Sequence, residues 1–109
     1  MSDFVGFLRG GPPQDLSPAE AQRTLERYLE WNARLTPAPG GGGLSRQGRV
    51  LRGLEVTDGP FAEGSEVVGG YITIAADSLE EATKIFSTHP HLTFGPIEVR
   101  KVGEQGCED

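Results

Sequence analysis

The sequence predicts one mixed α+β domain whose elements follow in the order strand, helix, strand, strand, helix, strand. Three observations support this order. Two capping-box patterns each open an apolar stripe of helical period, and short apolar runs of strand length precede, separate and follow them. Glycine and proline, 16 and 8 residues respectively, mark the turns between these segments. The length of 109 residues suits a single domain with one modest core.

A glycine-proline turn separates the first strand from the first helix. Residues 3–9 form a short apolar run that favours a buried strand. Ser17 then begins a helix, because it can cap the first turn while Glu20 completes a capping box. Pro18 suits the first helical position, and Pro37 ends the helix. The helical spacing indicates one apolar stripe, made of Ala21, Leu25, Tyr28, Leu29, Asn32 and Leu35.

Residues 40–66 are the least regular segment. We expect a strand near residues 42–46, a short excursion, and a strand-like piece at residues 54–57. The glycine run at 40–43 is no phosphate loop, since neither Lys-Ser nor Lys-Thr follows it and no helix starts there. It is interpreted as a linker or the entry to a strand.

The second half of the chain is more regular. Residues 67–76 predict a strand with Ile72 and Ile74 on one face and Tyr71 on the other. A second capping box at residues 78–81 opens a short helix, and Pro90 follows its end. Its inward side chains are expected to be Leu79, Ala82, Ile85 and Phe86. Residues 95–102 form the last strand, so that the domain spans residues 1–102 and residues 103–109 form a flexible polar tail.

This order is that of the ferredoxin-like split β-α-β fold. Two helices cover only one face of a four-stranded sheet. The first strand nevertheless has Phe4 and Leu8 on one face and Val5 and Phe7 on the other. Apolar residues on both faces imply that the second face is buried too, and a second copy of the chain is the economical cover. The sequence therefore predicts a homodimer formed through the sheet.

Composition excludes several classes of partner. The formal net charge of −6 argues against binding to nucleic acid or to an anionic membrane surface. No apolar run approaches the length of a membrane span, and no signal peptide opens the chain. A lone Cys107 cannot form a disulfide within the chain and has nothing nearby to activate it. We expect a cytoplasmic protein.

The stretch from Val56 to Glu63 (VTDGPFAE) resembles the signature of the YCII-related family, in its DGPF branch. Residues 68–71, 78–82 and 95–102 are similar to the same pattern. The resemblance implies a dimeric ferredoxin-like α/β barrel and a bacterial protein without an established reaction. Some relatives are regarded as candidate hydrolases or lyases that use a His-Asp pair, and others accompany alternative sigma factors. That pair cannot be transferred, because no histidine precedes His89, although Asp58 keeps the signature position.

The signature supplies the first candidate site. Asp58 and Glu63 flank a Gly-Pro-Phe turn, so that one carboxylate could act as a general base or anchor a ligand against Phe61. The alternative is structural: Asp58 hydrogen-bonds its own loop and Phe61 anchors packing. The candidate ligand-binding residues are Phe61, Trp31, Tyr71 and Arg100. For Trp31 and Tyr28 core packing is the favoured interpretation over a ligand platform, and Arg100 could pair with a carboxylate across the dimer.

His89-Pro90-His91 is the second candidate. Two imidazoles on alternate strand residues could bind a metal, but no third ligand stands at a matching spacing and Pro90 indicates a loop. We therefore predict no metal and no organic cofactor, and a solvent-facing or loop-capping pair of histidines. His89 remains a candidate general acid or base near neutral pH.

Two functional hypotheses follow from the sequence. The first is a dimer that binds a small organic molecule in a cleft beside residues 58–63 and transforms it, if at all, by acid/base chemistry of Asp58, Glu63 or His89. The second is a non-catalytic regulatory protein that binds another protein, such as an alternative sigma factor.

Overall fold

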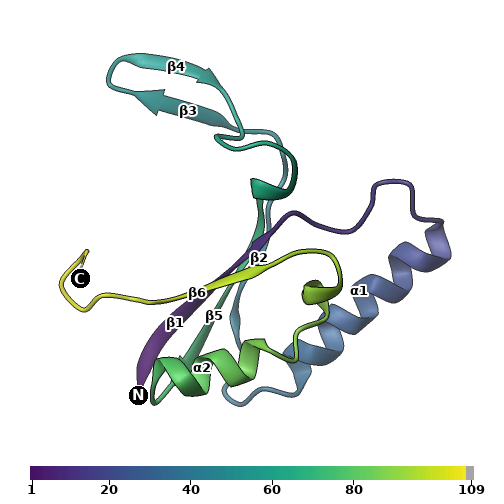
Figure 1. Cartoon of the computed structure of the whole chain (residues 1–109), viewed down its shortest axis with the longest axis vertical. Helices are drawn as coiled ribbons and strands as arrows, with labels where there is room; N and C mark the ends of the chain where they lie inside the picture. The colour runs from purple at the N-terminus through teal and green to yellow at the C-terminus, as the bar shows by residue number, and fades with distance from the viewer. Residues whose placement is uncertain (108–109) are drawn as a thin grey trace.

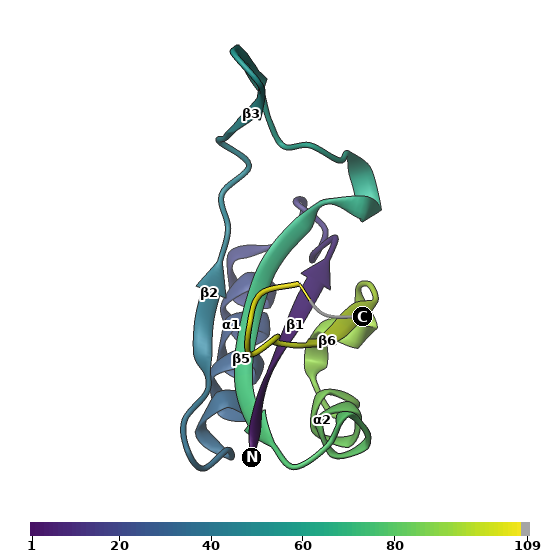
Figure 2. The same cartoon turned by 90° about the vertical axis from the view of Figure 1, so that its left-hand side faces the viewer.

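The computed structural model describes residues 1–107 and shows a four-stranded antiparallel sheet with two helices on one face (Figures 1 and 2). The strands of the sheet lie in the order β2-β5-β1-β6. Their bounds are Ser2–Arg9 for β1, Gly40–Gly43 for β2, Val68–Ala76 for β5 and Ile97–Lys101 for β6. The helices are α1 (Pro18–Ala33) and α2 (Leu79–Phe86). This topology is consistent with the predicted ferredoxin-like fold.

Between β2 and β5 the chain leaves the sheet. The strand predicted at residues 42–46 corresponds to β2, which begins two residues earlier. The strand-like piece predicted at residues 54–57 does not join the sheet. It forms β4 (Glu55–Asp58), which pairs with β3 (Arg49–Arg52) in a separate two-stranded hairpin. We call residues 44–66 the arm, since Figure 1 shows this hairpin beyond the end of the sheet. The arm also contains a single 3₁₀ turn, η1 (Gly64–Glu66).

Both helices begin where their caps predict. The Ser17 hydroxyl accepts a hydrogen bond from the Glu20 amide at 3.2 Å, and the Glu20 carboxylate accepts one from the Ser17 amide at 3.4 Å. In α2 the Ser78 hydroxyl accepts from the Glu81 amide at 3.1 Å. The Glu81 carboxylate, however, accepts from the amide of Asp77, one residue before the cap. The second box is therefore shifted by one residue from the predicted pattern.

The two helices sit differently on the sheet. α2 packs closely against β1, where a side chain at Gly6 would lie 2.6 Å from the Phe86 ring, so only glycine allows this approach. Phe86 in turn stacks on Trp31 of α1. Leu25 and Leu29 of α1, by contrast, remain half exposed although they belong to the predicted stripe. The core is made of Phe4, Leu8, Trp31, Ile72, Ile74, Ala76, Ala82 and Phe86.

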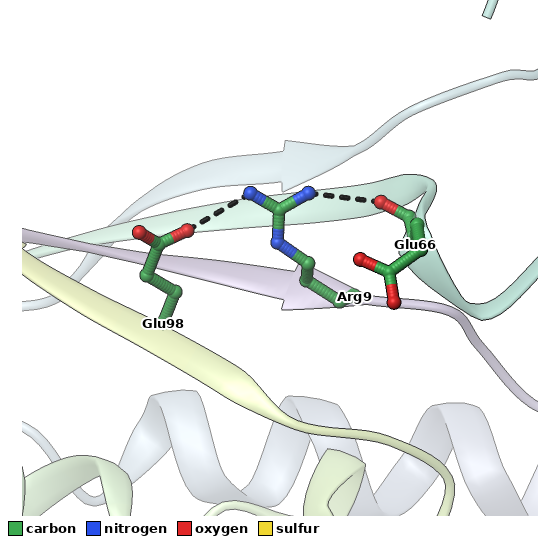
Figure 3. Close-up of polar contacts among 3 residues, drawn as sticks. All are labelled: Arg9, Glu66 and Glu98. Atoms are coloured by element: carbon green, nitrogen blue, oxygen red, sulfur yellow. Dashed lines mark hydrogen bonds and ion pairs between the residues drawn. The ribbon is translucent and has the colours of Figure 1, made fainter. Parts of the chain in front are cut away.

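The face of the sheet opposite the helices carries Val5, Phe7 and Tyr71, which are only partly buried or exposed. Figure 3 shows Arg9 lying across this face. Its guanidinium forms an ion pair with Glu98 of β6 at 2.9 Å and donates to the carbonyl oxygen of Glu66 at 2.8 Å. Arg9 thus connects β1, β6 and the base of the arm. Homodimer formation through this face stays a prediction.

No helix within residues 1–107 is long and apolar enough to cross a membrane. Cys107 is exposed and free. The predicted flexible tail at 103–109 stays a prediction, and its last two residues lie outside the described part of the chain.

Candidate functional site

A pocket of about 340 Å³ lies between α1 and the half of the sheet formed by β2 and β5. This volume falls within the range of small-molecule sites. Leu25 and Leu29 of α1 form one apolar wall, so these two residues of the predicted stripe remain half exposed while Tyr28 and Leu35 pack against the core. Gly40–Gly43 of β2 and residues 69–72 of β5 form the opposite side, and His89 and His91 also line the pocket.

The glycine run of β2 contributes to this space at Gly43. Gly43 pairs with Gly70, and Gly70 lies on the same face as Ile72, which points toward the helices. A β-carbon at Gly43 would find no other atom within 4 Å, so the missing side chain leaves open volume. Gly41 has a φ of +111°, which side chains rarely adopt, and a β-carbon there would collide with the Tyr71 carbonyl oxygen. Residues 40–43 are thus a strand of the pocket rather than a linker.

The two histidines are buried, with 3% of His89 and 2% of His91 exposed. They flank Pro90 at the start of the 3₁₀ turn η2 (Pro90–Thr93), where His89 is the N-cap and Pro90 the first residue. The Nδ1 atom of His89 accepts a hydrogen bond from the backbone amide of His91 at 2.9 Å. Of the two alternatives predicted for the pair, loop capping holds for His89, and solvent exposure holds for neither histidine.

Partners distant in sequence fix the ring of His91. Its Nε2 atom lies 2.7 Å from the carbonyl oxygen of Arg9, which can only accept, so Nε2 carries the proton. In the neutral ring Nδ1 then accepts from the hydroxyl of Tyr28, which lies 3.1 Å away. Both ring nitrogens of His91 are therefore occupied by β1 and α1.

The ring of His89 is held between two aromatic side chains. Trp31 meets it edge-on with ring centroids 4.5 Å apart, and Tyr28 does so at 5.0 Å. Trp31 is itself anchored, since its Nε1 donates to the hydroxyl of Thr88 at 2.9 Å. Burial, and then the nearby His91, lower the pKa of His89 to about 4, so the ring is neutral at pH 7. Burial also raises the pKa of Tyr28, which keeps its hydroxyl protonated.

Of the predicted site residues, the structure places His89 at the pocket. Tyr71 belongs to the stretch of β5 that lines the pocket, but its side chain lies on the face of the sheet opposite the helices, as its pairing with Phe7 shows. Trp31 contacts His89 from the core side. Arg100 lies on β6, paired with Val5 on the face opposite the helices, and does not line the pocket. Glu63 precedes η1 on the arm, and its side chain makes no capping hydrogen bond there.

Asp58 and Phe61 also lie on the arm, away from the pocket. The side chain of Asp58 is 91% exposed and forms an ion pair with Arg49 at 3.5 Å. Within residues 1–107 its carboxylate makes no hydrogen bond to its own loop, which corrects the structural alternative considered for this residue. Phe61 is 76% exposed and lies beneath the guanidinium of Arg52, 5.2 Å from the ring centroid, so it does not anchor packing.

Sequence reasoning missed the roles of His91, Tyr28 and the glycine run. The partners of His91 lie far away in sequence, so no local signal indicates them. Four glycines in a strand position, by contrast, indicate a bulge or the close approach of a ligand or backbone. No group of three metal-ligating side chains occurs within residues 1–107.

The comparisons with known proteins agree with this fold. The solved structure of 5-chloro-2-hydroxyhydroquinone dehydrochlorinase (TftG) from Burkholderia phenoliruptrix AC1100, in complex with 2,5-dihydroxybenzoquinone, matches with a TM-score of 0.55 and 17% sequence identity. The match covers 96% of this chain and 99% of that chain, and it shows a shared fold. No curated protein matches the sequence. The family model of the YCII-related domain matches residues 7–105, and the chain therefore belongs to the YCII-related family.

Proposed function

We propose that this YCII-related protein binds a small organic molecule in the pocket between α1 and β2-β5. The observation that carries the proposal is the combination of an apolar wall, at Leu25 and Leu29, with two buried imidazoles in a cavity of about 340 Å³. The complex of the structurally similar dehydrochlorinase with 2,5-dihydroxybenzoquinone supports a ligand of this size. The proposal therefore assigns the ligand to this pocket instead of the predicted cleft beside residues 58–63.

Any reaction in the pocket is proposed to proceed without a metal or organic cofactor, with the protein supplying hydrogen bonds rather than a side chain that titrates near pH 7. Among the three predicted catalytic residues, only His89 lines the pocket, while Asp58 and Glu63 lie on the arm. With a pKa of about 4, His89 does not titrate near neutral pH as a free histidine does. It therefore acts at pH 7 as a neutral hydrogen-bonding group.

We also propose that two copies associate through the sheet face that carries Val5, Phe7 and Tyr71. These side chains are apolar or aromatic, and no other element within residues 1–107 covers them. The mass measured by sedimentation or light scattering at micromolar concentration should equal two chains. A mass of one chain would contradict the dimer.

A second candidate function is regulatory binding to a protein such as an alternative sigma factor. The arm favours it, because Leu51, Leu54 and Val56 are all largely exposed there. The motif at residues 56–63 supports placing the chain in the DGPF branch of the family, some of whose members accompany such factors.

The small-molecule proposal is tested by thermal unfolding with and without 2,5-dihydroxybenzoquinone. A ligand at 100 times its dissociation constant stabilises the folded state by about 2.7 kcal/mol, so the unfolding midpoint should rise with ligand concentration. A midpoint that does not move at any soluble concentration, for this compound and for related ring compounds, would refute the pocket as a ligand site.

A further inference from the structure

The orientation of His89 contains information about the chemistry of the ligand. Its Nδ1 atom accepts the backbone N–H of His91 at 2.9 Å, and a backbone amide can only donate. The lone pair of Nδ1 is therefore used within the protein. A neutral imidazole carries one proton, so that proton must reside on Nε2.

The position of the Nε2 atom of His89 follows from its lack of a partner. Every buried side-chain nitrogen or oxygen within residues 1–107 has a hydrogen-bond partner. Nε2 of His89 has no such partner among these residues, so the atom must reach the accessible surface. The pocket between α1 and β2-β5 is the hollow that His89 lines.

The neighbours of His89 stabilise this protonation state. Tyr28 and Trp31 hold the ring plane from two sides. The backbone amide of His91 is itself held in place, because the His91 ring is hydrogen-bonded to Arg9 and Tyr28. Inversion of the His89 tautomer would direct an N–H at the N–H of His91, which is a repulsive contact.

We propose that His89 is held as a neutral imidazole with its Nε2–H directed into the pocket, so that the site selects ligands that present an acceptor oxygen there. The ligand class is a small ring compound with a carbonyl or deprotonated hydroxyl oxygen. Such a donor polarises a carbonyl and stabilises negative charge that develops on its oxygen. This inference rests on the proposed function of the pocket, and it adds the requirement for an acceptor.

The tautomer can be measured without any ligand. Long-range ¹H–¹⁵N correlation spectra of the ¹⁵N-labelled protein at pH 7 distinguish the two neutral tautomers and the imidazolium. We expect His89 with a protonated Nε2 and an unprotonated Nδ1. A protonated Nδ1, alone or together with Nε2, would overturn the inference whether or not the pocket binds a ligand.

Selection is tested with two ring compounds of similar size, 2,5-dihydroxybenzoquinone, which offers acceptor oxygens, and 1,4-diaminobenzene, which offers donors. The quinone should bind the wild type and shift the Nε2–H signal of His89, and the diamine should not. Binding of the diamine alone would overturn the inference and leave the pocket standing. If neither compound binds, the proposed function fails as well.

The variant His89→Asn separates capping from ligand binding. The asparagine side-chain oxygen can replace Nδ1 as the acceptor for the backbone amide of His91. The asparagine side chain is, however, one atom too short to reach the position of Nε2. We expect the quinone to bind about tenfold more weakly, the usual effect of one lost hydrogen bond, while the far-ultraviolet circular dichroism spectrum reports an intact fold. Asp58→Asn, on the exposed arm, is the matched control and should bind as the wild type does. Equal affinity of the wild type and His89→Asn would overturn the inference.

Discussion

The pocket and the arm differ in how the structure holds their polar side chains. In the pocket, His89 and His91 are almost wholly buried and receive hydrogen bonds or ring contacts from β1, α1 and η2. On the arm, the side chains of Asp58 and Phe61 are largely exposed, and among residues 1–107 they interact only with Arg49 and Arg52 of the hairpin. The most specific sequence motif, residues 56–63, thus lies on the arm. The side chains whose burial and fixed partners can change their chemistry lie in the pocket instead.

The two phenylalanines Phe86 and Phe61 give the largest expected contrast. Phe86 is buried between Trp31 and Gly6, so Phe86→Ala should lower the free energy of unfolding by about 3–5 kcal/mol. Phe61→Ala removes an exposed ring and should change it by less than about 0.5 kcal/mol. Denaturant unfolding of both variants checks the pair. A comparable loss in Phe61→Ala would mean that the arm is packed against another molecule in solution.

The pH dependence of stability should reveal the buried His89. Its pKa is about 4 in the folded protein and 6.5 in the unfolded chain, so between these values only the unfolded chain binds the proton. The contribution of the neutral His89 ring to the free energy of unfolding is therefore fully present above pH 6.5. It is lost as the pH falls toward 4, by on the order of 3 kcal/mol in total.

Unfolding free energies of the wild type and His89→Asn, measured between pH 4 and 7.5, isolate this contribution. The difference in unfolding free energy between the wild type and His89→Asn should shrink as the pH falls through this window. A difference that does not depend on pH would show that His89 titrates alike in the folded and unfolded states.

Asp58 should show the smallest effect. Its carboxylate is exposed and its ion pair with Arg49 spans 3.5 Å, so Asp58→Asn and Asp58→Ala should each alter stability by less than about 0.5 kcal/mol. Unfolding curves at neutral pH would measure this. A loss confined to Asp58→Ala would instead indicate a turn residue whose side chain is needed for local hydrogen bonds.

Local signals in the sequence predicted most of the fold. The caps at Ser17 and Ser78 and the alternation in β5 act over a few residues, and the structure contains these elements in the predicted order. The sequence predicts a strand-like piece where β4 lies and only an excursion where β3 lies, because the pairing of β3 with β4 is internal to the hairpin and leaves no apolar face toward the core.

The candidate site was harder to predict, because its chemistry depends on contacts between distant residues. The partners of His91 are Tyr28 and Arg9, 63 and 82 positions away. Nothing near His89 or His91 in sequence indicates that either ring is buried. The glycine run similarly acquires its meaning only beside α1, where the missing side chains become the side of a cavity.

The location of the ligand site is tested most directly by filling the pocket. Gly43 and Gly48 both have a φ that other residues adopt and no atom within 4 Å of a β-carbon, but only Gly43 lines the pocket. The dissociation constant of 2,5-dihydroxybenzoquinone should be measured by calorimetry for Gly43→Leu and Gly48→Leu. We predict that Gly43→Leu abolishes binding and that Gly48→Leu, at the base of the hairpin, binds as the wild type does. Unchanged binding in Gly43→Leu, with loss in Gly48→Leu, would place the site on the arm.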